Sequence, residues 1–341
     1  MTFGGKIAVA LGALALACTA VATARADEIP TLILATALPP GNPLADQVLH
    51  PWADRVNAAA DGKLKIDIRD GMAIANLNNS YDRVVADVAQ ISWLTHGNFA
   101  GKFQRSTVGG LPFIAGESSE KASVAMWRLY RDGLFGPEYD EVRPISLAVL
   151  SQSNFHFRAK PASLANLKGL KVITSSRETG ELAQRLGMAP IVLAVTQSYE
   201  ALQRNTVDGV MLGWTAVLSF KLQEVTTYHV EAALGTATGM LFIGKKRYES
   251  LPASAKAVLD KFSGEGETRE LGKFWDRLQV FGDKLVKGLP NQTVIDAPPD
   301  LVAKWRADAE PVAADWAKRT PDGAKVLKAF REELAKVDAG Q

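Results

Sequence analysis

One short segment combines the residue types that bind a carboxylate. It reads Leu170-Lys171-Val172-Ile173-Thr174-Ser175-Ser176-Arg177-Glu178, an apolar strand followed by polar residues. Ser175 and Glu178 stand in the S-x-x-E relation of a capping box, which predicts that a helix begins directly after the strand. Amides at a helix start and a guanidinium both donate to carboxylate oxygens. We therefore predict that Ser176 and Arg177 help to bind an organic anion.

Arg177 also has an ordinary interpretation, as a solvated residue of the first helical turn. A cation at that end opposes the helix dipole, and this unfavourable placement favours a role in binding. A donor of some kind is needed, because burying an unpaired carboxylate costs several kcal/mol or more. Arg158, at the end of Phe155-His156-Phe157-Arg158, is the next candidate, with a surface position at a strand end as its alternative.

Two further strand ends carry aromatic and hydroxyl groups. The segment 207–214 ends in Gly213-Trp214, and the segment 91–97 carries a Trp-Leu-Thr-His run. Each tryptophan either packs in a core or forms an apolar wall for a ligand, and both interpretations remain open. Such groups, facing each other from two halves, would suit an enclosed small organic molecule. The predicted ligand contacts beyond the first segment and Arg158 are Trp93, Thr95, His96, Ser153 and Trp214.

The sequence gives little support for catalysis. The histidines His50, His96, His156 and His229 lack the spacing of metal ligands, so we expect no metal. The sequence contains no G-x-S-x-G elbow, no P-loop and no G-x-G-x-x-G after a strand. We therefore expect no cofactor, and binding rather than catalysis.

The N-terminus has the order of an export signal. Lys6 precedes an apolar run over residues 7–21, and Ala24-Arg25-Ala26 follows. This predicts a cleaved signal over residues 1–26 and a periplasmic protein. A membrane anchor is the alternative, but the run is shorter than the ~20 residues of a bilayer span. A lipid anchor at Cys18 is disfavoured, because Ala15 stands where such signals usually carry Leu.

Composition supports a water-soluble globular protein. The chain has 341 residues, of which 47% are hydrophobic and 22% charged, with 39 basic and 37 acidic side chains. Two of the basic residues lie in the signal, so the mature chain has no net formal charge. This argues against nucleic acid as a partner, and the length predicts two domains.

Apolar strand-like runs alternate with helical patterns, which indicates an α/β protein. The clearest unit has strands over 170–174 and 190–195 with a helix over 176–186, the spacing of a parallel crossover. A helix over 197–204 and a strand over 207–212 repeat the pattern. After a strand over 239–244 we expect helices over 253–261, 268–288, 299–319 and 323–339.

Four separate segments, spread over nearly the whole mature chain, carry recognisable motifs. They comprise Trp93, Gly101-Lys102-Phe103 and Leu111-Pro112-Phe113; Leu164-Ala165-Asn166-Leu167-Lys168-Gly169-Leu170-Lys171-Val172; Leu186-Gly187-Met188-Ala189-Pro190; and Tyr199-Glu200-Ala201-Leu202-Gln203 with Val207-Asp208-Gly209. In these segments the sequence resembles the DctP-like solute-binding proteins of tripartite ATP-independent periplasmic (TRAP) transporters.

The resemblance implies a two-domain periplasmic-binding-protein-like clamshell with hinge strands and long C-terminal helices. We place domain I at 27–150 plus 238–277 and domain II at 151–237 plus 278–341. The family's usual ligand-binding Arg corresponds to Ile173, and a usual Asn corresponds to Leu212, so this chain lacks two polar anchors. Arg177 looks like the replacement.

The function that this resemblance implies is capture of a small organic anion and its delivery to small and large membrane permease subunits. The apolar Ile173 and Leu212 favour an aromatic or 2-oxo monocarboxylate as the ligand. Two alternatives remain: an exported α/β hydrolase acting on an organic acid, and a ligand-sensing partner of a membrane receptor.

Overall fold

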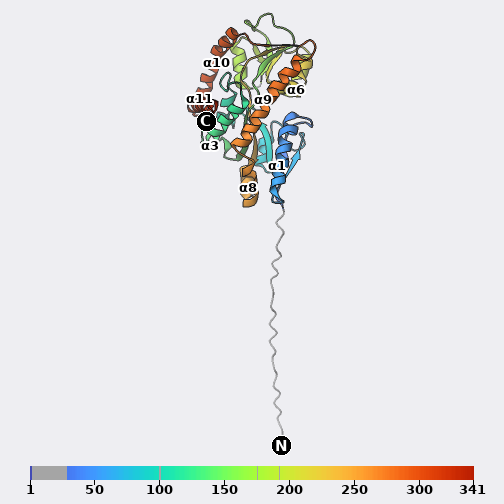
Figure 1. The fold of residues 1–341 in the computed structure, drawn as a ribbon, viewed down its shortest axis with the longest axis vertical. Helices are drawn as coiled ribbons and strands as arrows, with labels where there is room; N and C mark the ends of the chain where they lie inside the picture. The colour runs from blue at the N-terminus through green and yellow to red at the C-terminus, as the bar shows by residue number, and fades with distance from the viewer. Residues whose placement is uncertain (2–28, 100, 175, 192) are drawn as a thin grey trace.

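The computed structural model describes residues 1, 29–99, 101–174, 176–191 and 193–341. Apart from Met1, the predicted export signal with Cys18 lies outside these residues, and so does Ser175. The described chain forms two lobes, each built on one sheet (Figure 1).

The first lobe contains a five-stranded sheet in the order β2-β1-β3-β10-β4. Strands β2 and β3 run parallel to β1, whereas β10 is antiparallel to both β3 and β4. Every residue of β10 is buried, since apolar clusters cover the sheet on both faces. The strands are β1 (Thr31–Ala35), β2 (Lys65–Arg69), β3 (Ile91–Thr95), β4 (Val142–Val149) and β10 (Thr238–Gly244).

The second lobe contains a six-stranded sheet in the order β11-β9-β5-β8-β6-β7. Strand β6 pairs in parallel with β7 and β8, so the predicted crossover is confirmed. The strands are β5 (Asn154–Phe157), β6 (Lys171–Thr174), β7 (Ala189–Ile191), β8 (Gly209–Leu212), β9 (Tyr228–Glu231) and β11 (Thr293–Asp296).

Helices cover both sheets, which confirms the predicted α/β class. The α-helices are α1 (His50–Ala60), α2 (Ser80–Val85), α3 (Ser119–Arg131), α4 (Arg177–Arg185), α5 (Ser198–Gln203), α6 (Trp214–Ser219), α7 (Lys245–Ser250), α8 (Ala253–Lys261), α9 (Glu265–Lys287), α10 (Pro299–Arg319) and α11 (Gly323–Asp338). Shorter π or 3-10 turns are η1 (Ala45–Leu49), η2 (His96–Phe99), η3 (Arg105–Gly110), η4 (Gly136–Tyr139), η5 (Val195–Gln197) and η6 (Leu222–Glu224).

Two chain segments connect the lobes side by side. The N–H of Leu150 donates to the carbonyl of Ala237 (3.0 Å), and the N–H of Ser153 donates to the carbonyl of Gly235 (2.7 Å). The side chains of Ser151, Ser153 and Thr236 are buried here. The lobes therefore meet at a short, hydrogen-bonded pair of segments.

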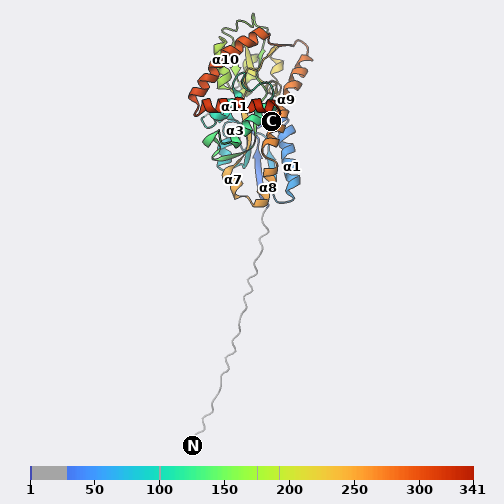
Figure 2. The ribbon, with the colours of Figure 1, turned by 60° about the vertical axis from the view of Figure 1, so that its left-hand side comes forward.

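Helix α9 spans both lobes, as Figure 1 shows. Trp275 packs near Trp93 of the first lobe, with ring centroids 6.2 Å apart, whereas Gly282 lies against Trp214 of the second. Helix α11, which the sequence-based division assigns to domain II, packs beside α3 through buried residues that include Phe330 (Figure 2). The C-terminal helices thus return the chain to the first lobe.

The close approach of α9 to Trp214 generates a stability prediction. A Cβ at Gly282 would lie 2.5 Å from the Cβ of Trp214. We expect Gly282→Ala to lower the free energy of unfolding by about 1–3 kcal/mol through overpacking. Gly266 is the matched control on the same helix, because a Cβ there meets nothing within 4 Å. Gly266→Ala should raise stability by up to about 1 kcal/mol through helix propensity. Urea denaturation measures both changes, and a shift of the same sign in both variants would contradict the packing argument.

Candidate ligand-binding cleft

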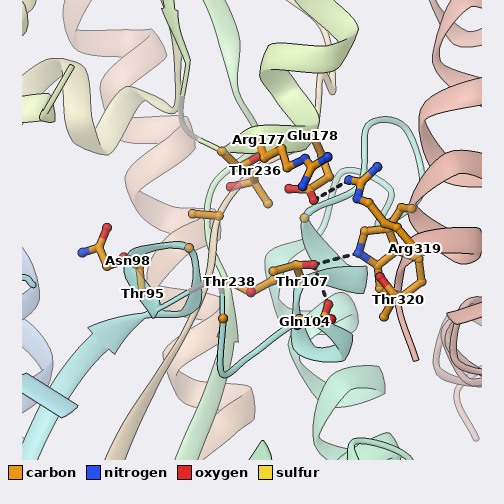
Figure 3. Close-up of a pocket in the computed structure, with 16 residues that line it drawn as sticks. Thr95, Asn98, Gln104, Thr107, Arg177, Glu178, Thr236, Thr238, Arg319 and Thr320 are labelled. Atoms are coloured by element: carbon orange, nitrogen blue, oxygen red, sulfur yellow. Dashed lines mark hydrogen bonds and ion pairs between the residues drawn. The ribbon is translucent and has the colours of Figure 1, made fainter. Parts of the chain in front are cut away.

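A cleft of about 540 Å³ lies between the lobes (Figure 3). The first lobe contributes the end of β3 and the turns that follow it, and the second lobe contributes the start of α4. The last turn of α10 and residues 236–238 complete the lining. The polar side chains that line it include Thr95, Asn98, Gln104, Thr107, Ser176 and Thr236.

The start of α4 is fixed by a capping box. The hydroxyl of Ser176 accepts a hydrogen bond from the N–H of Thr179 (3.2 Å), and the hydroxyl of Thr179 accepts one from the N–H of Ser176 (3.0 Å). The predicted helix start is confirmed. Of the predicted capping pair, Ser175 lies outside the described residues, and the capping role predicted for Glu178 was wrong. Its carboxylate instead pairs with Arg319 (2.9 Å), so it does not serve as the returning member of the box.

Arg177 is the first residue of α4 and lines the cleft. Its side chain is 69% exposed, and its Nε donates to Oε1 of Glu181 at 2.9 Å. Within the described part of the chain, Glu181 is the one partner of this guanidinium, which leaves its Nη groups available.

Arg319, at the end of α10, joins two carboxylates of α4. Its Nη2 lies 2.9 Å from Oε1 of Glu178, and its Nη1 lies 3.0 Å from Oε2 of Glu181. In Figure 3, a dashed line joins Arg319 to Glu178, close to Arg177. Two guanidinium groups and two carboxylates therefore form a chain with no net charge at this end of the cleft.

Thr95 lines the cleft, whereas His96 lies buried behind it. The hydroxyl of Thr238 donates to the carbonyl of Ser106 (3.0 Å), so it accepts from Nδ1 of His96 (2.9 Å). Nε2 of His96 lies 3.1 Å from the Tyr139 hydroxyl, which also lies 2.8 Å from the hydroxyl of Ser106. Burial lowers the pKa of His96 to about 3, so its imidazole is neutral. His96 thus supports Thr238, which itself lines the cleft.

The two predicted tryptophans lie in the cores. Trp93 belongs to the apolar cluster of the first lobe. Trp214 is fully buried in the second, where its Nε1 donates to Oε1 of Glu231 (2.9 Å). Its ring contacts the imidazoles of His156 and His229. The structure therefore does not bring either tryptophan to the described cleft.

Ser153 and Arg158 lie away from the described lining as well. Ser153 is buried in the segment between the lobes, and the backbone N–H of Arg158 donates to the carbonyl of Asp208 (3.0 Å). Ile173 and Leu212 are buried in a core cluster of the second lobe. Of the predicted contacts, the cleft brings together Ser176, Arg177 and Thr95.

Sequence reasoning missed the contribution of α10. Trp316 lines the cleft, and its Nε1 donates to the hydroxyl of Thr107 in the first lobe (2.8 Å). Arg319 follows one turn later. A cation in the last turn of a helix normally signals only the helix dipole, so no local pattern marks Arg319 as a cleft residue.

Among the described residues, no cluster of three His, Cys, Asp or Glu side chains has the arrangement of a metal site. No helix in the described ranges is both long and apolar enough to cross a bilayer.

Comparison with known proteins places this geometry in context. A family model described as bacterial extracellular solute-binding protein, family 7, matches residues 34–319. A relative in Comamonas testosteroni, named outer membrane transporter protein TsaT, is 24% identical over 316 residues, covering 89% of this chain and 92% of the relative.

Two solved structures share the fold at a TM-score of 0.83. One is a marine metagenome TRAP solute-binding protein specific for aromatic acid ligands, in complex with 3-hydroxybenzoate; it is 26% identical, over 90% of this chain and 98% of its own. The other, from Rhodoferax ferrireducens, was solved with copurified benzoate; it is 27% identical over the same shares. The predicted clamshell fold is thereby confirmed.

The buried imidazole behind the cleft makes stability depend on pH. His96 has a pKa near 6.5 when unfolded and about 3 when folded, so between these values the unfolded state binds a proton that the folded state does not. Stability is therefore present above pH 6.5 and falls by roughly 1.4 kcal/mol per unit as the pH drops towards 3.

We expect His96→Gln to remove this contribution. Glutamine can still hydrogen-bond to Thr238 or Tyr139, while the lowered pKa values of His156 and His229 remain in the variant. Between pH 7 and pH 5 the variant should lose about 2 kcal/mol less unfolding free energy than the wild type. Urea denaturation at the two pH values measures this, and equal losses would refute the assignment.

Proposed function

Because the chain belongs to family 7 of the bacterial extracellular solute-binding proteins, we propose that it captures an aromatic monocarboxylate between its two lobes. The proposal extends to delivery of this anion to the small and large membrane subunits of a TRAP transporter in the periplasm. The observation that carries it is the position of Arg177, which lines the cleft as the first residue of α4.

Two kinds of donor support an anion at this place. The Nη groups of Arg177 can pair with both oxygens of a carboxylate. The first amides of α4, a helix of nine residues, lie at its positive end and can also donate to an anion. The capping box at Ser176 and Thr179 holds this turn before a ligand arrives, so little ordering remains to be done.

The charge balance of the cleft supports a single negative charge on the ligand. Arg319 is already shared by Glu178 and Glu181, whereas Arg177 has Glu181 as its one carboxylate partner among the described residues and keeps its Nη groups for a ligand. A second ligand carboxylate would find no further cation among the described lining residues that is not already paired with two carboxylates. Dicarboxylates should therefore bind poorly.

The aromatic class is supported by the two structures above with bound benzoate and 3-hydroxybenzoate. In this chain, the aromatic Trp316 is among the residues that line the cleft, together with Thr95 and Thr107. The cleft volume lies within the range of small-molecule sites.

The action we propose is reversible capture without chemical change. Ligand binding stabilises the closed arrangement of the lobes only by the difference in its affinity for the two states. In this proposal the two lobes close on the ligand, and the paired segments around Ser153 and Gly235 serve as the hinge. Benzoate recovered from the protein should accordingly be unaltered.

The proposed role of Arg177 is tested by Arg177→Ala. Loss of a charge-assisted contact worth about 1.5–3 kcal/mol should weaken benzoate binding about 10- to 150-fold. Arg204→Ala is the matched control, because Arg204 is 70% exposed and pairs with Glu200 four residues away on α5. Isothermal titration calorimetry measures both variants. Unchanged benzoate affinity in Arg177→Ala would refute the assignment.

Ligand charge is tested by comparing benzoate with isophthalate, which adds a second carboxylate to the same ring. We expect the wild-type protein to bind benzoate at least about tenfold more tightly, since the second charge finds no free cation. Thermal shift at matched concentrations reports the difference, because a ligand at 100 times its Kd adds about 2.7 kcal/mol of stability. Equal stabilisation by the two acids would contradict the charge argument.

A further inference from the structure

The guanidinium that lines the cleft is held by a carboxylate of its own helix. Nε of Arg177 donates to Oε1 of Glu181 at 2.9 Å, one turn further along α4. Arg177 and Glu178 line the described cleft, whereas Glu181 does not. The contact therefore draws the guanidinium back along the helix, away from the first amides where a carboxylate would bind.

This pair is suited to being exchanged. The Arg177 side chain is 69% exposed, so solvent screens the attraction. The order along the helix, with the cation before the anion, is also the weaker of the two arrangements at this spacing. A ligand carboxylate that also receives helix amides can replace Glu181 as the partner of Arg177.

Glu181 does not lose all its partners in such an exchange. Its other oxygen, Oε2, lies 3.0 Å from Nη1 of Arg319. Its side chain is 23% exposed, so it retains access to water as well. No carboxylate is left buried and unpaired when Arg177 moves, and the exchange becomes a direct competition between two carboxylates for one guanidinium.

We propose that Glu181 sets the ligand affinity of the cleft by competing with the ligand's carboxylate for Arg177. This inference rests on the proposed function. It makes Glu181, a residue outside the described lining, a determinant of how readily the protein takes up and releases its ligand.

The test is Glu181→Gln, titrated with benzoate. The neutral amide keeps the shape of the side chain but attracts Arg177 less, so the Kd for benzoate should fall about twofold, the effect of an exposed ion pair at this helical spacing. Glu200→Gln is the matched control, because Glu200 forms an exposed pair with Arg204 on α5. Its Kd should equal that of the wild type.

A double variant distinguishes competition from a structural effect. In the Arg177→Ala background, Glu181→Gln should bring no gain in affinity, because the contested group is absent. Equal gains in both backgrounds would overturn the proposal, since they would show a general effect of removing a negative charge.

Unchanged or weaker benzoate binding by Glu181→Gln would also overturn the proposal, because Glu181 would then orient Arg177 or have no effect on it. That result leaves the proposed function intact if Arg177→Ala still weakens binding. A wild-type protein that binds neither benzoate nor any other carboxylate would instead defeat the proposed function, and this inference with it.

Discussion

A carboxylate that leaves water for a cleft must meet a donor that is in place beforehand, because desolvation of an unpaired anion costs several kcal/mol or more. In the proposed function, the first turn of α4 meets that requirement. The box formed by Ser176 and Thr179 fixes the turn, and Arg177 follows directly from it. The position of this turn depends on β6, because α4 begins shortly after that strand ends. Strand β6 is in turn held in the sheet of the second lobe by β7 and β8.

The same requirement explains the charges around Arg177. A lone guanidinium beside a helix start would suffer from the helix dipole. Here it is compensated by Glu181, which is itself tied to Arg319. Arg319 belongs to α10, next to Trp316, whose indole donates to Thr107 of the first lobe. The last turn of α10 therefore contacts both walls of the cleft, and the C-terminal helices take part in the site as well as in the fold.

Patterns within a few residues predicted much of this architecture. Helix α8 has the predicted bounds, as does α10, and β6, α4 and β7 form the predicted parallel unit. Contacts distant in sequence account for the differences. Glu178 was expected to cap α4, but it pairs with Arg319, a residue 141 positions away that no local spacing reveals. From the sequence alone, a tryptophan at a strand end is as consistent with a core position as with a cleft wall. In the structure, His156, His229 and α9 pack around Trp214, which places it in the core.

Ile173 and Leu212 stand at the two positions where the resemblance implies polar anchors. Both side chains are buried in one apolar cluster of the second lobe, beside Val210 and Leu202. A charged or amide side chain in either place would need a partner within that cluster. Filling both positions with apolar residues stabilises the sheet and removes donors from the strand ends. The donor then has to come from the first residues beyond β6, where the helix start supplies amides. Arg177 stands at that point, so the packing of the sheet supports the proposed role of Arg177 as well as its own charge does.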